Sequence, residues 1–244
     1  PTVGTSVTFL IFAGILLILA FIYFAGKKTK TVKSAVSGIL FLLCLFFGRS
    51  DSFAFWESGL TYEGESVYNY LQVSENAENV ILSTNVLFGV QSIYKKNGTL
   101  TGMYYDYALA APYMAGARKK DSLDILILGM GTGTFATQCG NYFDNFHITG
   151  VEIDGDITKL AHQYFHLSEE IPVYTYDGRA FLNAVDKKYD VIMVDAYQDI
   201  TIPFQMSSVE FFALVKEHLA GDGVMVVNMN MRGKDEGNIN QYLA

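Results

Sequence analysis

The sequence predicts an α/β protein with a parallel, doubly wound sheet, preceded by a small antiparallel β unit and an apolar N-terminal region. Three observations lead to this prediction. Apolar runs alternate with amphipathic stretches from residue 123 to residue 229, a glycine-rich turn follows the first run, and acidic residues follow the next three. Strands that alternate with helices form parallel sheets, because the helices serve as right-handed crossovers.

Residues 1–50 are expected to form a transmembrane region. Residues 6–26 carry no charge, and about 20 apolar residues span a bilayer. Four lysines follow, and a second, shorter apolar run covers residues 35–48. A signal peptide and a buried helix of a soluble protein are the alternatives for the first run. Signal peptides, however, have a shorter apolar core that follows its charges, and this run is long for a buried helix.

The orientation in the membrane depends on the second run. Lysines between the two runs should face the cytoplasm. The rest of the chain then lies outside the cytoplasm if both runs span, and inside if the second run only lies in the interface. We expect membrane attachment with the C-terminal part of the chain in the cytoplasm.

Residues 51–107 are expected to form a small β-hairpin domain. Runs at residues 68–75, 79–84 and 89–94 are rich in β-branched and aromatic residues, with Asn and Gly between them. A helix is expected to begin near Met103.

Residues 108–244 are expected to form a Rossmann-like catalytic domain whose sheet is truncated at its C-terminal end. The expected strands cover residues 123–129, 147–154, 172–178, 189–197 and 223–229, and the helices cover 131–143, 155–167, 179–185 and 207–221. Ligands of such sheets bind at the carboxyl ends of the strands.

Composition excludes several classes of function. The formal net charge is −8, and without clustered Lys and Arg the chain is a poor nucleic-acid binder. The cysteines, Cys44 and Cys139, form no CxxC pair, and His162 and His166 lack a third ligand at a suitable spacing, so no metal site is expected. Neutral or cationic small molecules suit this protein better.

The glycine-rich turn "LGMGTGT" places Gly129, Gly131 and Gly133 between a strand and a helix. Glycine lets a backbone turn tightly and approach a ligand closely. Glu152 ends the next strand, 21 residues after Gly131, where an acid typically holds ribose hydroxyls. Asp177 ends the third strand and could accept a hydrogen bond from an adenine amino group.

This turn reads GxGxG and lacks the sixth-position glycine of a dinucleotide site. The pattern favours an adenosine ligand without phosphates, such as S-adenosylmethionine or its decarboxylated form. The alternative is that the glycines and acids serve only turns and helix caps, which would require a coincidence at three strand ends.

Taken together, these motifs resemble the spermidine synthase family of polyamine aminopropyltransferases, and most of all its membrane-fused branch. The resemblance covers about residues 68–228 and is carried by "YYDYALAAP", "LGMGTGT", "VEID", "YDGRAFL" and "YDVIMVDAY" with "IPFQMSSVEFF". It implies a β unit followed by a class I methyltransferase fold, and a homodimer is possible.

The resemblance also implies roles for individual residues. Asp195 would be the catalytic acid-base, and Tyr104, also a catalytic candidate, would line the amine channel together with Asp106. Glu152 and Asp177 would bind the ribose and the adenine. The remaining candidates are Thr132 and Gly178 for the aminopropyl donor, and Asn69, Gln91 and Asp106 for the amine or the tail of the donor.

The chemistry explains why a strand should end in Asp195. An alkyl amine has a pKa of about 10.4, so deprotonating it at pH 7 costs about 4–5 kcal/mol. A carboxylate at the cleft attracts the cation and accepts its proton as the new bond forms. Tyr197 could supply a cation–π face, and Asp199 a second carboxylate, although a solvated position is the alternative for Asp199.

Two departures from the family pattern leave alternatives open. Thr132 stands where the family has an aspartate that holds the amino group of the donor, and "DAYQD" replaces DSSDP or DSTDP. An S-adenosylmethionine-dependent methyltransferase is therefore the second hypothesis. The third is a membrane-tethered protein that binds a nucleoside or polyamine without turnover.

Overall fold

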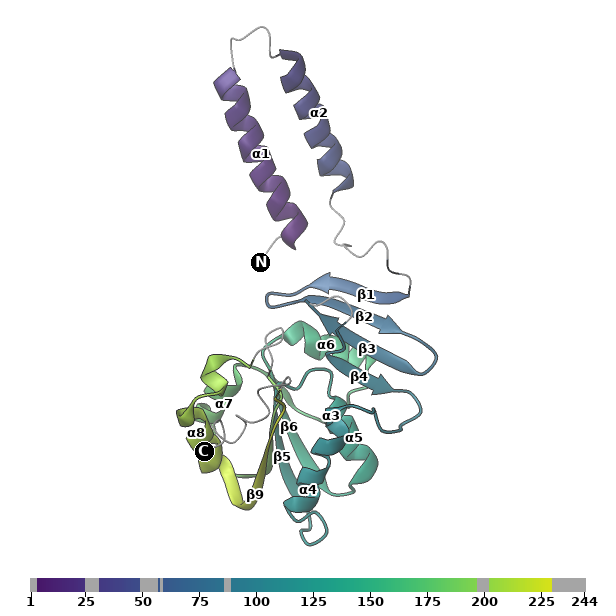
Figure 1. Cartoon of the computed structure of the whole chain (residues 1–244), viewed down its shortest axis with the longest axis vertical. Coiled ribbons are helices and arrows are strands. Elements are labelled where there is room, and N and C mark those ends of the chain that lie inside the picture. The colour runs from purple at the N-terminus through teal and green to yellow at the C-terminus, as the bar shows by residue number, and fades with distance from the viewer. Residues whose placement is uncertain are drawn as a thin grey trace, which may run out of the picture. The chain divides into compact units, whose positions relative to one another are not determined.

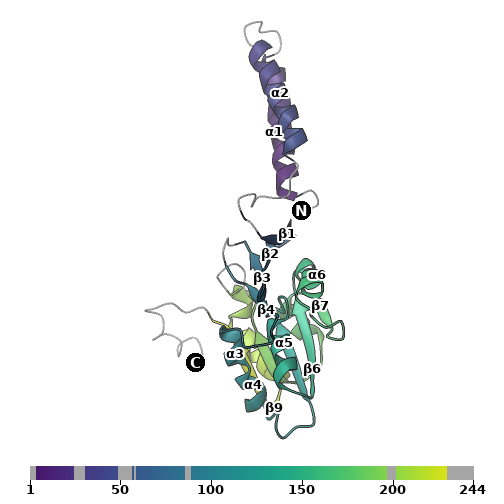
Figure 2. The same ribbon diagram turned by 90° about the vertical axis from the view of Figure 1, so that its right-hand side faces the viewer.

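The computed structural model describes residues 4–24, 31–48, 57, 59–85, 89–196 and 202–229. The chain divides into two compact units, residues 1–72 and 73–244. Figures 1 and 2 show the elements in two perpendicular views. Tyr197 and Asp199, two of the substrate-binding candidates, lie outside the described residues.

Two apolar helices, α1 (Gly4–Phe24) and α2 (Thr31–Phe47), open the first unit. Helix α1 is long and apolar enough to cross a membrane, with a mean hydropathy of 2.8 in its most apolar window and no buried residue. Helix α2 is shorter but also apolar. The two helices interlock, because a β-carbon at Gly14 would lie 3.0 Å from Phe41 and one at Gly38 would lie 3.6 Å from Phe21.

A four-stranded sheet follows in the order β1 (Leu60–Glu65), β2 (Tyr70–Glu75), β3 (Asn79–Thr84) and β4 (Ser92–Lys95). The boundary between the two units falls within β2. The last three strands match the predicted runs, whereas β1 was not predicted. Its sequence, LTYEGE, has two glutamates and a glycine in six residues, so it carries little strand signal of its own.

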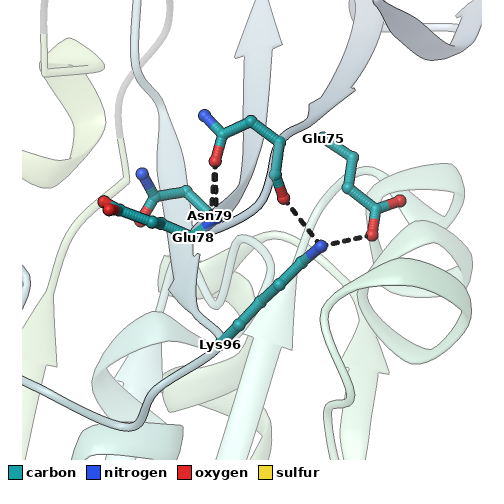
Figure 3. Close-up of polar contacts among 5 residues, drawn as sticks. Glu75, Glu78, Asn79 and Lys96 are labelled. Atoms are coloured by element: carbon teal, nitrogen blue, oxygen red, sulfur yellow. Dashed lines mark hydrogen bonds and ion pairs between the residues drawn. The ribbon is translucent and has the colours of Figure 1, made fainter.

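The turn between β2 and β3 is closed by side chains (Figure 3). The Asn76 side-chain oxygen accepts hydrogen bonds from the backbone N–H groups of Glu78 and Asn79, at 2.9 and 2.8 Å. Lys96 Nζ, just after β4, donates to the Asn76 carbonyl at 2.7 Å and pairs with Glu75 at 2.6 Å. This is Asx-turn chemistry, in which a short amide side chain mimics a backbone turn.

The single helix predicted from Met103 is broken into α3 (Tyr104–Ala108) and α4 (Ala110–Met114). Pro112 explains the break. It has no N–H to donate to the carbonyl of Ala108, four residues earlier, and its ring crowds that carbonyl.

The second sheet is the predicted parallel sheet, with strand order β7-β6-β5-β8-β9. Its strands are β5 (Leu123–Leu128), β6 (Phe146–Glu152), β7 (Val173–Thr175), β8 (Tyr189–Val194) and β9 (Leu219–Val227). The intervening helices are α5 (Thr134–Tyr142), α6 (Gly155–Tyr164), α7 (Gly178–Ala184) and α8 (Val209–His218), with a short 3₁₀ turn, η2 (Phe204–Met206), before α8.

Side chains of the central strand alternate between two hydrophobic cores, as the period of two in a strand requires. Ile125 and Ile127 of β5 belong to the core that packs against α3, α4 and α5. Leu126 and Leu128 belong to the core that packs against α7 and α8. Figure 1 shows these two groups of helices on opposite faces of the sheet. Together with the parallel strand order, this layering confirms the predicted fold class.

Candidate active site

The strand order creates a switch point between β5 and β8. From β5 the chain first moves to one side of the sheet through β6 and β7, and then returns to the other side through β8 and β9. Ligands of open α/β sheets bind at such a point, beyond the carboxyl ends of the strands. The glycine-rich turn follows β5 and Asp195 follows β8, so the two motifs flank the switch point.

The glycine-rich turn can take its path only because it lacks side chains. Gly129 has φ +86°, and a β-carbon there would lie 2.6 Å from the carbonyl oxygen of Asp195. Gly131 has φ +54°, and its β-carbon would lie 2.8 Å from Ser92 Oγ. The turn therefore runs in close contact with the end of β8 on one side and the start of β4 on the other.

Strand β4 is fastened to the start of α5 beside this turn. Thr134 Oγ donates to the Ile93 carbonyl at 2.9 Å and accepts from the Ile93 N–H at 3.2 Å. Thr132, in the turn itself, is 1% exposed, and its hydroxyl has no hydrogen-bond partner among the residues described. Gly133 ends the turn as the left-handed N-cap of α5.

Glu152 ends β6 and holds the turn by its carboxylate. Its two oxygens accept hydrogen bonds from Gly131 N–H at 2.8 Å and from Asp154 N–H at 3.0 Å. Burial raises the pKa of Glu152 to about 7, although both backbone bonds favour the charged form. Each carboxylate oxygen has a second lone pair, so this group can still accept a hydroxyl donor.

Asp177 follows β7 and caps helix α7. Its carboxylate accepts a hydrogen bond from the Ala180 N–H at 2.8 Å, as an N-cap aspartate should. The next residue, Gly178, packs closely, since a β-carbon there would lie 3.2 Å from Met206 and 3.4 Å from Leu128. The predicted contacts of Asp177 and Gly178 with the aminopropyl donor stay predictions.

The Asp195 carboxylate lies between two side chains that donate to it, one to each oxygen. Tyr104 O–H donates to Oδ2 at 2.5 Å, and Asn228 Nδ2 donates to Oδ1 at 2.8 Å. Burial raises the pKa of Asp195 to about 6, against the opposing effect of both donors. At neutral pH the group is therefore mostly ionised, yet close enough to its pKa to take up a proton.

Tyr104 stays protonated in this setting. Burial is the main cause of its raised pKa, followed by the charges of Tyr105 and Asp195. The neighbouring Tyr105 is also buried and donates its hydroxyl hydrogen to the Gln91 carbonyl at 2.8 Å. The structure thus brings the two catalytic candidates, Tyr104 and Asp195, into contact, although 91 residues separate them in sequence.

Asp106 serves the turn that precedes α3. Its carboxylate accepts from Thr101 N–H at 2.9 Å, from Thr101 Oγ at 2.8 Å and from Gly102 N–H at 2.6 Å. This arrangement anchors the beginning of the helix that carries Tyr104. The Asn69 N–H donates to Ser66 Oγ at 2.9 Å in the turn between β1 and β2, within the other compact unit. The substrate-binding roles of Asn69, Gln91 and Asp106 stay predictions.

Sequence reasoning missed Asn228. It lies immediately after β9 within "VVNMN", which is not among the motifs that carry the family resemblance. The signal that could have found it is the strand order, since a parallel neighbour of β8 must place its own end residue beside Asp195. Within the described parts of the chain, no group of three His, Cys, Asp or Glu side chains could hold a metal ion.

Comparison with known proteins gives a consistent result. The spermine/spermidine synthase domain matches residues 108–237. The "Probable polyamine aminopropyl transferase" of Bifidobacterium longum is 57% identical over 223 residues, which are 91% of this chain and 49% of that protein. The polyamine aminopropyltransferase of Vibrio vulnificus is 27% identical over 202 residues, covering 80% of this chain and 67% of that protein. The chain thus spans between about half and two thirds of these relatives.

Solved structures share the fold. A probable spermidine synthase from Corynebacterium glutamicum aligns with a TM-score of 0.66 at 20% identity, covering 77% of this chain and 70% of that one. A spermidine synthase solved with the transition-state analogue AdoDATO aligns with a TM-score of 0.56 at 18% identity, covering 69% and 57%. Human methyltransferase-like protein 13 in complex with SAH aligns with a TM-score of 0.50 at 24% identity, covering 57% of this chain and 69% of that one.

Proposed function

The chain belongs to the spermine/spermidine synthase family, and on this premise we propose that it is a polyamine aminopropyltransferase. It would move an aminopropyl group from decarboxylated S-adenosylmethionine to an amine such as putrescine and release methylthioadenosine. The observation that carries the proposal is the Asp195 carboxylate, held by Tyr104 and Asn228 in backbone contact with the glycine-rich turn.

The proposed reaction needs a base more than any other group. The sulfonium of the donor already activates the carbon that is attacked, so the protein mainly aligns the reactants and manages one proton. The ammonium substrate passes its proton to Asp195, and the freed nitrogen lone pair forms the C–N bond as the C–S bond breaks. The leaving sulfur becomes a neutral thioether, and Asp195 later returns the proton to solvent.

The residues at the switch point fit an adenosine-type ligand. Glu152 has lone pairs free for ribose hydroxyls, the glycine turn exposes backbone rather than side chains, and Asp177 stands at the next strand end. We assign the ribose to Glu152 and the adenine to the Asp177–Gly178 segment. The amine would lie between Tyr104 and Asp195, with Gln91 and Asp106 as further candidates, and with Tyr197 and Asp199 next along the sequence. Asn69, which belongs to the other compact unit, stays a candidate from the family resemblance alone.

Mass spectrometry of the products tests this function. The full chain in detergent is incubated with putrescine and either decarboxylated S-adenosylmethionine or S-adenosylmethionine. An aminopropylated amine together with methylthioadenosine is expected from the first donor. Asp195→Asn should abolish product formation while the donor still binds, and loss of donor binding in that variant would contradict the role assigned to Asp195.

A methyltransferase is the second candidate, and Thr132 is the observation that favours it. The turn offers an uncharged, buried hydroxyl at the position where the spermidine synthase pattern has an aspartate for the ammonium of the donor. A site without that charge discriminates less against a donor that still carries its carboxylate. A methylated amine and S-adenosylhomocysteine formed from S-adenosylmethionine would establish this candidate in place of the first.

We also propose that α1 and α2 attach the protein to a membrane, with the catalytic part in the cytoplasm. The surface of α1 is apolar on all sides, and the hydroxyls of Thr8 and Ser37 bond to the carbonyls four residues earlier, which satisfies them in an apolar medium. Reporter fusions after residue 229 test the orientation. Signal from a reporter that works only outside the cytoplasm would contradict the proposed orientation. It would indicate that both helices span the membrane, because the lysines between them then face the cytoplasm and the rest of the chain lies outside.

Analytical ultracentrifugation tests the homodimer that the family resemblance implies.

A further inference from the structure

Asn228 lies directly beside Asp195 because their strands are parallel neighbours. Val194 pairs with Val227 in the ladder, and the Asn228 N–H donates to the Val194 carbonyl at 3.0 Å. From this anchored backbone, Asn228 Nδ2 reaches Asp195 Oδ1 at 2.8 Å. We propose that Asn228 is a positioning residue for the reaction, which fixes the rotamer and the ionised form of the Asp195 carboxylate. This inference rests on the proposed function.

Two donors on two oxygens define the plane of the carboxylate. Tyr104 approaches Oδ2 from helix α3, and Asn228 approaches Oδ1 from the position directly after strand β9. Rotation of the carboxylate about its Cβ–Cγ bond would stretch both hydrogen bonds at once. A base must be within hydrogen-bond reach of the proton that it accepts, so this orientation decides which lone pairs remain for the amine.

Both donors also favour the ionised carboxylate. An amide Nδ2 can only donate, and the Tyr104 hydroxyl keeps its proton because burial raises its pKa. Burial of Asp195 works in the opposite direction. Among the described residues, the titratable groups that act on Asp195 are Tyr104 and Tyr105 of α3. The neighbouring strands contribute uncharged residues at their ends, which are Gly129 after β5 and Asn228 after β9. Asn228 therefore supplies one of the two side-chain hydrogen bonds that oppose burial.

The direct test is the titration of Asp195 itself, measured without reference to turnover. The full chain is labelled with ¹³C at the aspartate carboxyl carbons, and Asp195→Asn identifies the Asp195 resonance. Wild type should titrate with a midpoint of about 6. In Asn228→Ala we expect the midpoint to rise by about one pH unit or more, because a hydrogen bond to a charged group is worth that much.

Two further variants sharpen the test. Asn228→Asp keeps the shape of the side chain but places a second carboxylate against Asp195, so the midpoint of the pair should rise further than in Asn228→Ala. It also serves as the readout if Asn228→Ala does not fold. Asn183→Ala is the matched control, because Asn183 is exposed on α7 and its amide donates within that helix, to the Arg179 carbonyl at 2.9 Å.

Kinetics give the second readout. With putrescine and the decarboxylated donor, kcat of Asn228→Ala should fall about twofold or more at pH 7, because a midpoint of about 7 leaves about half of Asp195 ionised. The acid limb of kcat/KM should move up with the carboxyl midpoint. A variant whose Asp195 midpoint equals that of wild type overturns the inference, whatever its activity. If wild type forms no aminopropylated product, the proposed function fails, and the titration still decides whether Asn228 controls Asp195.

Discussion

Replacing Tyr104 by Phe removes one hydroxyl and leaves the ring in place. The hydroxyl donates to Asp195 Oδ2 at 2.5 Å, and it lowers the pKa of a carboxyl group that burial has raised to about 6. A hydrogen bond to a charged group is worth about 1.5–3 kcal/mol, which corresponds to about one to two pKa units. The pKa of Asp195 in Tyr104→Phe should therefore be about 7.5.

This shift predicts a pH-dependent loss of activity. The ionised fraction of Asp195 at pH 7 falls from about 90% to about 24%, a loss of about fourfold, because each pKa unit is a factor of ten in the equilibrium. The same shift gives a loss of about 16-fold at pH 6 and almost none at pH 8.5. Protonation of the amine substrate affects both enzymes equally and cancels in the ratio.

The assay is kcat/KM for methylthioadenosine release between pH 5.5 and 9. Tyr107→Phe is the matched control, since Tyr107 lies on the same helix but is 84% exposed. Its profile should match that of wild type. A loss in Tyr104→Phe that is the same at every pH would refute the reasoning, because it would mean that the hydroxyl acts on something other than the protonation of Asp195.

Three further predictions concern the turn and its acids. Glu152→Ala should weaken binding of adenosine ligands by about 10- to 100-fold, the size of a lost hydrogen bond to a charged group, and unchanged affinity by calorimetry would contradict the ribose assignment. The pKa values of Asp195 and Glu152 rise on folding from 3.8 and 4.5 to about 6 and about 7. Their contribution to the free energy of unfolding should therefore fall as pH rises from about 4 to about 7, by at most about 3 kcal/mol each. Thermal melts in which Glu152→Gln loses as much stability with rising pH as wild type would exclude this account. Gly129→Ala should lower kcat by about 100-fold, which is the effect of a shift of about 1 Å at a reacting group. Gly98→Ala is the control, because Gly98 also has a positive φ but has open space around it, so this variant should keep its activity. Equal activity in those two variants would disprove the coupling between the turn and Asp195.

The sequence predicted the parts of this structure that depend on local pattern. The five parallel strands follow from apolar runs such as residues 123–129, and the helices between them follow from their amphipathic periods. Helix α3 ends early because Pro112 interrupts the hydrogen-bond ladder, and this proline is the local signal in the sequence that indicates the break. Strand β1 has no comparable pattern, and its pairing partners supply its stability.

The candidate site was predictable where one motif carries one residue, and less so where the fold brings residues together. Gly129, Glu152 and Asp195 each stand at a strand end that could be identified from the sequence. Asn228 could be identified only once β9 was known to lie next to β8. The cap formed by Asp177 and the turn held by Asp106 show that acids at such positions also serve the backbone, which no motif distinguishes from ligand binding.

The bond between Thr134 and Ile93 limits how this site can open. The Thr134 hydroxyl satisfies both the N–H and the carbonyl of Ile93 in the protein interior. Moving β4 away from α5 would leave these two buried backbone groups without a hydrogen-bond partner. Strand β4 and the base of α5 must therefore travel as one body. Release of a product would then require movement of another part of the site, while Ser92 stays fixed beside Gly131.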